Sequence, residues 1–98
     1  MNLNIRNSVI VALVQALLGA VSENFRVVLV RFSEGLHVEF YIDQKLEEDM
    51  EEIDDVITEF DSLVMGICAV SITFEVNVGV EKVDFSGADV VPVYIRRG

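Results

Sequence analysis

The sequence has no tryptophan, one cysteine, one proline and one histidine, and only seven basic residues stand against seventeen acidic ones. The lone Cys68 cannot form an internal disulfide, which argues against a small secreted framework and favours a reducing cytoplasm. Its place in the apolar run ICAV predicts a buried structural thiol. Zinc and di-iron sites use more histidine than this chain contains, so we expect no metal and no cofactor.

Long hydrophobic runs are also missing. The apolar run at residues 9–21 is interrupted by Gln15 and is too short to span a bilayer, so no membrane anchor is expected. The net charge of −10 opposes binding to nucleic acids and to anionic membranes, because their phosphates repel a surface of the same sign. A basic protein is the partner class that this charge favours.

Apolar residues make up 52% of the 98 residues, enough for one core, and we expect a single domain over residues 1–98. Hydrophobic periodicity predicts helices at 3–21 and about 44–65, and strands at 24–32, 36–43, about 68–78 and about 90–96. This order, α-β-β-α-β-β, is typical of an α+β two-layer sandwich. We expect a four-stranded antiparallel sheet with both helices on one face.

Several single residues predict local geometry. Asn2, Asn4 and Asn7 are candidate N-caps of the first helix, and Asp43 is a candidate N-cap of the second. Gly66 is placed to end the second helix in a left-handed conformation. Gly35 lies between two strands, where a tight hairpin needs a positive φ. Pro92 cannot donate a ladder hydrogen bond, so the last strand should lie at an edge or carry a bulge.

The stretch LEEDMEEIDDVITEFD at residues 46–61 combines a helical core face with an acidic face. It holds nine carboxylates and no Lys or Arg. Its apolar residues are spaced by steps of three and four, as the buried face of one helix requires. Those residues, continuing to the end of the helix, are Leu46, Met50, Ile53, Ile57, Phe60 and Val64. The carboxylates predicted to face solvent are Glu47, Glu48, Glu51, Glu52, Asp54, Asp55 and Glu59.

A charged run is usually only the solvated face of a helix, and acids in its first turn favour the helix dipole. Here, however, the pairs 47/51, 48/52, 51/55 and 55/59 are all like-charged. Each such pair destabilises a helix by about 0.2–0.5 kcal/mol, so folding alone does not explain the absence of lysine. The pattern contains no EF-hand loop, and it favours a surface that imitates a row of phosphates for a basic protein.

His37, Glu39, Tyr41 and Asp43 alternate with apolar residues and share one face of a predicted strand. Residues in a row on one strand do not converge as catalysis requires, so a polar sheet surface is the favoured interpretation. A binding role for Tyr41 on that surface remains open, because tyrosine is common in interfaces. Arg96 and Arg97 could reach the acidic helix or remain mobile. No catalytic motif is present, and we expect no enzyme activity.

Three segments of the sequence resemble a known family: ALLGAVSENFR (16–26), VEFYIDQKLEEDMEEIDDVITEF (38–60) and VYIRR (93–97). The family consists of small acidic immunity proteins of bacterial contact-dependent growth inhibition and related polymorphic toxin systems. The resemblance implies a cytoplasmic inhibitor that binds the toxic C-terminal domain of a cognate effector, commonly a nuclease. It assigns no binding residue, because contact residues diverge rapidly in such families.

The leading hypothesis is therefore an immunity protein, monomeric or homodimeric, that neutralises a basic toxin domain. Its predicted contacts are the seven carboxylates and Tyr41. The alternative is a structural subunit of a small homo-oligomer, joined through surplus apolar surface of the first helix or through an unpaired strand edge. A small enzyme using His37 and neighbouring acids is a third hypothesis.

Overall fold

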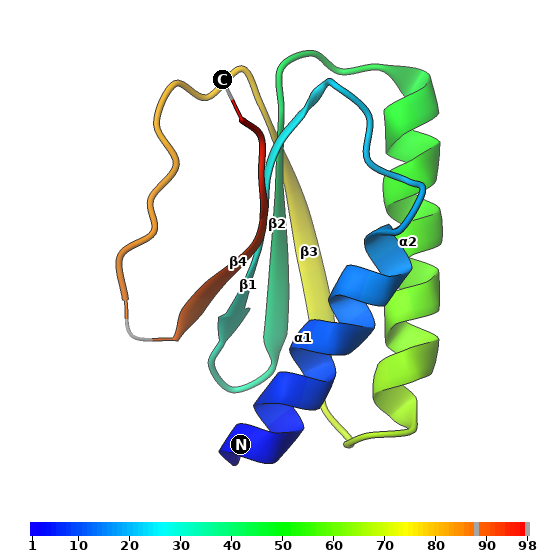
Figure 1. The fold of residues 1–98 in the computed structure, drawn as a ribbon, viewed down its shortest axis with the longest axis vertical. Coiled ribbons are helices and arrows are strands. Elements are labelled where there is room, and N and C mark those ends of the chain that lie inside the picture. Colours follow the sequence, from blue (N-terminus) through cyan, green and yellow to red (C-terminus); the bar gives the residue numbers. More distant parts are fainter. Residues whose placement is uncertain (88, 98) are drawn as a thin grey trace.

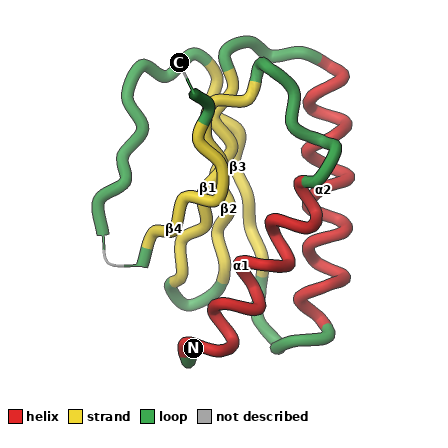
Figure 2. The backbone as a smooth tube through the Cα atoms, in the orientation of Figure 1, coloured by secondary structure: helices red, strands yellow, loops and turns green. Residues whose placement is uncertain are grey.

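A computed structural model describes residues 1–87 and 89–97, and in this part of the chain two helices lie on one side of a four-stranded sheet (Figure 1). The elements are α1 Leu3–Leu17, β1 Phe25–Phe32, β2 Leu36–Ile42, α2 Glu47–Met65, β3 Ile72–Val78 and β4 Val90–Ile95. Figure 2 shows the same arrangement with the long connection between β3 and β4 on the opposite side of the sheet. The predicted order, the α+β class and the placement of both helices are confirmed.

The strand order is β3-β2-β1-β4, and one of its pairs departs from the prediction. Strand β1 is antiparallel to β2 and to β4, whereas β2 and β3 are parallel, from Leu36 opposite Ile72 to Ile42 opposite Val78. The expectation of a wholly antiparallel sheet is therefore wrong. Helix α2 returns the chain to the end of the sheet where β2 began, so the next strand runs in the same direction.

Strand β4 is an edge strand, as Pro92 predicted. The register between β1 and β4 also shifts between Val28 and Leu29, whose partners are Tyr94 and Pro92. Pro92 thus lies on an edge strand, beside an irregularity in the pairing with β1. Its missing N–H therefore removes no hydrogen bond from the interior of the sheet.

The core lies between the helices and the near face of the sheet. Phe25, Phe40 and Phe60 are fully buried, and the rings of Phe25 and Phe40 meet edge to face at 6.5 Å between centroids. On α2 the buried row is Ile53, Val56, Phe60 and Val64, with Asp49 at its upper end. The predicted apolar row is partly wrong. It included Leu46, which is 41% exposed, and it left out Val56, which is 2% exposed.

The predicted helix ends are confirmed in one case and wrong in others. Asn2 caps α1, because its side-chain oxygen accepts a hydrogen bond from the Ile5 N–H at 2.9 Å. Helix α1 ends at Leu17 instead of residue 21, followed by Gly19 at φ +81°. Asp43 does not cap α2, whose N-cap is Leu46 without a side-chain hydrogen bond. Gly66 does not adopt the left-handed conformation, since its φ is −80°.

Position 35 needs a glycine because a side chain there would not fit. The predicted positive φ is wrong, since Gly35 is not among the described glycines with positive φ. A Cβ at Gly35 would lie 2.7 Å from the carbonyl oxygen of Ser71, which is closer than such contacts allow. The Leu36 N–H donates to the same oxygen at 2.9 Å, so the β1–β2 hairpin is held directly against the start of β3.

Asp49 joins the start of α2 to the segment that enters β1. It is 5% exposed, and its carboxylate accepts hydrogen bonds from the Ser22 hydroxyl at 2.9 Å and from the Asn24 side-chain amide at 2.8 Å. Asn24 also exchanges two hydrogen bonds with the backbone of Gln44, which precedes the helix. The carboxylate lies in the first turn of α2, where the helix dipole favours it.

Arg96 closes the same end of the sheet. Its guanidinium donates to the Asp43 carboxylate at 2.6 Å and to the Glu23 carbonyl oxygen at 2.8 Å. The hydrogen bond from Arg96, with a further contribution from the charge of Arg26, lowers the pKa of Asp43 below its ordinary value. The end of β4 is thereby tied across β1 to the end of β2.

We predict that Asp49→Ala lowers the free energy of unfolding by about 1–3 kcal/mol, because it leaves part-buried donors on Ser22 and Asn24 without their acceptor. Urea unfolding followed by circular dichroism measures the change. The matched control is Glu48→Ala, an exposed position in the same helical turn, which should stay within about 0.5 kcal/mol of the parent. Equal losses in the two variants would contradict the structural role of Asp49.

A second prediction concerns acid stability. The pKa of Asp43 is lower in the folded state than its ordinary value of 3.8. The ion pair of Asp43 therefore stabilises the fold at pH values above 3.8, and this contribution is lost as the pH falls through the lower pKa of the folded state. Asp43→Asn should therefore flatten the decline of the unfolding free energy between neutral pH and that acid range. Urea titrations at several pH values test this, with the exposed Glu34→Gln as the control that should keep the parent slope.

Candidate functional site

The solvent side of α2 carries a continuous acidic surface. All seven carboxylates predicted to face solvent are exposed, and they extend along a helix of 19 residues, about 28 Å long at 1.5 Å per residue. We call this set the acidic row; it consists of Glu47, Glu48, Glu51, Glu52, Asp54, Asp55 and Glu59. Asp61 is exposed beyond its lower end.

The acidic row has no internal counter-charge. Among residues 1–87 and 89–97, the ion pairs join Arg6 to Asp89, Arg26 and Arg96 to Asp43, Arg31 to Glu39, and His37 to Glu75. None of them involves a carboxylate of the acidic row. Of the two alternatives for Arg96, contact with the acidic helix is wrong, since Arg96 is bound to Asp43. The row therefore presents its full negative charge to whatever approaches α2.

Asp49 differs from the carboxylates of the acidic row because it is buried. It lies at the upper end of the row Ile53, Val56 and Phe60, with the spacing of four, three and four that marks the buried face. That spacing was visible in the sequence, where a carboxylate on an apolar face indicates a buried, hydrogen-bonded group. The prediction centred the face on Met50 and Ile57 instead and so missed the role of Asp49.

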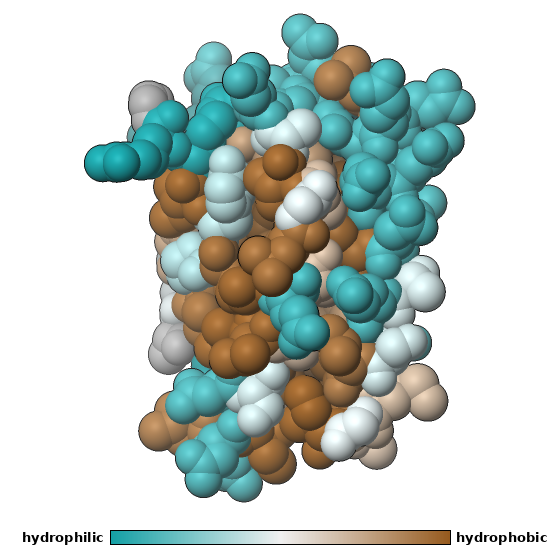
Figure 3. Space-filling model, turned by 45° about the vertical axis from the view of Figure 1, so that its right-hand side comes forward, coloured by the Kyte–Doolittle hydropathy of each residue, from teal (hydrophilic) through white to brown (hydrophobic). Residues whose placement is uncertain are grey.

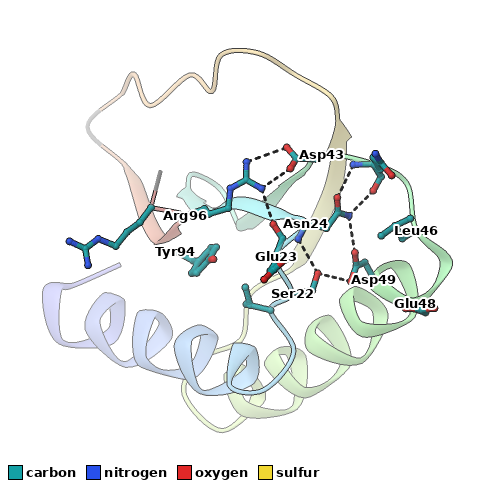
Figure 4. Close-up of a pocket in the computed structure, with 12 residues that line it drawn as sticks. Ser22, Glu23, Asn24, Asp43, Leu46, Glu48, Asp49, Tyr94 and Arg96 are labelled. Carbon is teal, nitrogen blue, oxygen red and sulfur yellow. Dashed lines mark hydrogen bonds and ion pairs between the residues drawn. The ribbon is translucent and has the colours of Figure 1, made fainter.

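An open cleft lies beside the first turn of α2 (Figure 4). Glu48 and Leu46 come from the helix side, Asp43 and Arg96 from the strand ends, and Asn24 lies between them. The hydrogen bonds of Asp49 and Arg96 described above form the walls of this cleft, as the dashed lines in Figure 4 show. Hydrogen bonds already engage the side chains of Asn24, Asp43, Asp49 and Arg96, and the cleft continues the acidic row at Glu48.

The other face of the sheet is not the open polar surface that the sequence predicted. Val80 and Val83, from the connection between β3 and β4, pack there against Val27, Leu29 and Tyr41. Tyr41 is consequently 7% exposed. The expectation of a solvent-exposed Tyr41 is wrong, because a long connection without regular structure covers it.

Arg26 and Arg31 hold this connection in place through backbone oxygens. Arg26 donates to the carbonyls of Val80 and Glu81, and Arg31 donates to the carbonyl of Asp84 at 2.7 Å. Each arginine belongs to β1, so the connection is fastened to the centre of the sheet at two points.

Glu39 is the buried centre of a polar network on this face. Its carboxylate is paired with the Arg31 guanidinium and accepts a hydrogen bond from the Tyr41 hydroxyl at 2.5 Å. The hydrogen bond to Glu39 raises the pKa of Arg31, while burial and the same carboxylate raise the pKa of Tyr41 to about 12. Both partners of Glu39 therefore keep their protons at neutral pH, and the network stays intact.

His37, Glu39 and Glu75 offer possible metal-ligand atoms within 4.8 Å of one another. Each is already engaged: the His37 ring nitrogens lie 2.7 Å from Thr73 Oγ1 and from Glu75 Oε1, and Glu39 is bound to Arg31. The contact with His37 lowers the pKa of Glu75. A cation here would have to displace these contacts beside a guanidinium, so the group serves to join β2 to β3.

Comparison with known proteins places the chain in one family. The family model described as MafI2 immunity protein matches residues 6–97, a range that includes all four strands, α2 and most of α1. A search of curated proteins finds no match to the chain. Maf is a polymorphic toxin system, so the immunity class implied by the resemblance is confirmed, without specific support for contact-dependent growth inhibition. The chain belongs to the MafI2 immunity protein family.

Proposed function

We propose that this immunity protein neutralises its cognate toxin by binding a basic toxin domain, of the nuclease class, through the acidic row of α2. The family supports a toxin as partner and an inhibitory, non-catalytic role. The observation that carries the proposal is the row of seven exposed carboxylates without an internal counter-charge. A nuclease has a cationic groove that binds phosphates, and a row of carboxylates with similar charge density can occupy it.

The energetics of α2 support a role beyond folding. Like charges four residues apart destabilise a helix, yet no lysine or arginine relieves them. Charge on a partner-binding surface mainly raises the association rate, which is the property an inhibitor needs against a toxin that acts quickly. We place this encounter in the cytoplasm, which suits the lone thiol of Cys68. Within the described residues, no helix is long and apolar enough to cross a membrane.

The proposed contact predicts a position-specific loss of binding. Glu51→Gln combined with Glu52→Gln should lower the association rate constant for the purified cognate toxin domain by about three- to tenfold at low salt, and should reduce its salt dependence. Stopped-flow kinetics over a salt series measures both. The control combines Glu34→Gln with Glu81→Gln, which removes the same charge from exposed positions outside α2.

The control decides how the result is interpreted. If only the helix pair slows association, the acidic row is the contact. If both pairs slow it equally, net charge alone steers the toxin and the proposed surface is wrong. If neither pair has an effect, the toxin binds elsewhere.

A single reversal of charge should separate folding from binding. Glu51→Lys places a lysine between Glu47 and Asp55, each four residues away, and turns two repulsive pairs into attractive ones. The free energy of unfolding should rise by about 0.5–1.5 kcal/mol, while association with the toxin domain slows. Urea unfolding and stopped-flow binding on the same sample test this, with Glu34→Lys as control. If the variant is more stable and binds the toxin domain as well as the parent does, the acidic row is only a solvated helix face and the proposed contact is wrong.

A further inference from the structure

Helix α1 is apolar on its outer side as well as on its inner side. Its inner row, including Val9, Leu13 and Leu17, is buried in the core. The outer apolar residues are Leu3, Val11 and Val14, together with Leu18 directly after the helix, and they are 70%, 64%, 42% and 76% exposed. Figure 3 shows the apolar surface on the helical side of the molecule, bordered by hydrophilic side chains. The outer side also carries the exposed polar residues Asn4, Asn7, Ser8 and Gln15, but exposed apolar side chains gathered on one helix face are typical of an interaction surface.

The outer residues follow the spacing of a helix–helix seam. Within α1, Asn7, Val11 and Val14 are separated by four and three residues, the alternation that places side chains on one stripe facing a second helix, and the C-cap residue Leu18 follows Val14 by four. An antiparallel copy of α1, related by a twofold axis between Val11 and Val14, puts Val11 of each copy against Val14 of the other. The same axis places Asn7 opposite Leu18 at both ends. The stripe is therefore complementary to itself, as a twofold interface requires.

Charge selects a second copy as the occupant. Residues 7–22 contain no charged side chain, although the chain carries a net charge of −10. The charges that flank this segment in the sequence are those of Arg6 and Glu23; the Arg6 guanidinium lies 4.5 Å from the centroid of the Phe32 ring and is paired with Asp89. Two copies of so acidic a protein repel through most surfaces, but the α1 face brings no carboxylates directly together. A basic toxin, by contrast, is attracted to the acidic row of α2.

We propose that the outer face of α1 is the surface through which two copies of this chain associate, with the helices antiparallel and the Val11–Val14 contacts at the centre. The inference goes beyond the proposed function and does not depend on it. A single pair of 15-residue helices makes a small interface, so the association is weak and reversible. The acidic row stays accessible on α2 of each copy.

Sedimentation equilibrium of the full chain, from about 10 µM to about 1 mM, tests the proposal in the range of a small interface. The parent should shift from monomer to dimer across the series. Val11→Glu should weaken dimerisation at least about tenfold, because it buries a charge that faces an apolar side chain of the other copy. The control Met65→Glu adds the same charge at an exposed apolar residue outside α1 and should dimerise like the parent. Circular dichroism confirms that each variant is folded.

A mixing experiment tests the register. Val14→Lys alone should also be monomeric, but mixed with Val11→Glu it should form a heterodimer, since the introduced lysine of one chain then faces the introduced glutamate of the other. Recovery in the mixture supports the antiparallel contact. A parent that stays monomeric at every concentration overturns the proposal, as does a dimer unaffected by Val11→Glu. A monomeric parent whose Val11→Glu variant loses toxin binding assigns this face to the toxin, which also overturns the proposal.

Discussion

Helix α2 connects two strands that run in the same direction, and this constraint determines the rest of the molecule. A parallel pair needs a crossover that spans the length of the sheet, so α2 must lie across β2 and β3 with its apolar row inward. The opposite side of a helix held in this way is necessarily exposed along its whole length. The topology thus exposes the side of α2 that carries the acidic row. It does not determine which residues occupy that side.

The sequence predicted the elements and the acidic row because both depend on local periodicity. The steps between Met50, Ile53, Ile57 and Phe60 are enough to place a helix and its solvent side. Alternation along residues 36–43 likewise identified the core face of β2, where Val38 and Phe40 are fully buried. Pro92 marked an edge strand for a reason that needs only its missing N–H. These inferences require no knowledge of which distant segments meet.

The features that escaped prediction all depend on distant contacts. Tyr41 was expected at the surface because its strand alternates cleanly, but Val80 and Val83 cover it from a segment far along the chain. Asp49 belongs to an acidic run, and only its contacts with Ser22 and Asn24 distinguish it from its neighbours. The direction of β3 is a property of how α2 packs. Hydrophobic periodicity cannot predict any of these features, because it describes each helix or strand separately and contains no information on contacts between them.

The connection between β3 and β4 is held by main-chain oxygens, and this has a consequence for how the protein can vary. Arg26 and Arg31 recognise carbonyl groups at Val80, Glu81 and Asp84, which every amino acid supplies. Most side chains of this segment can therefore be exchanged without loosening its attachment, provided that its inward valines remain apolar. The attachment of this segment, on the side of the sheet away from the helices, therefore places few demands on the identity of its side chains. A lineage of such proteins can change its outline there without rebuilding its core.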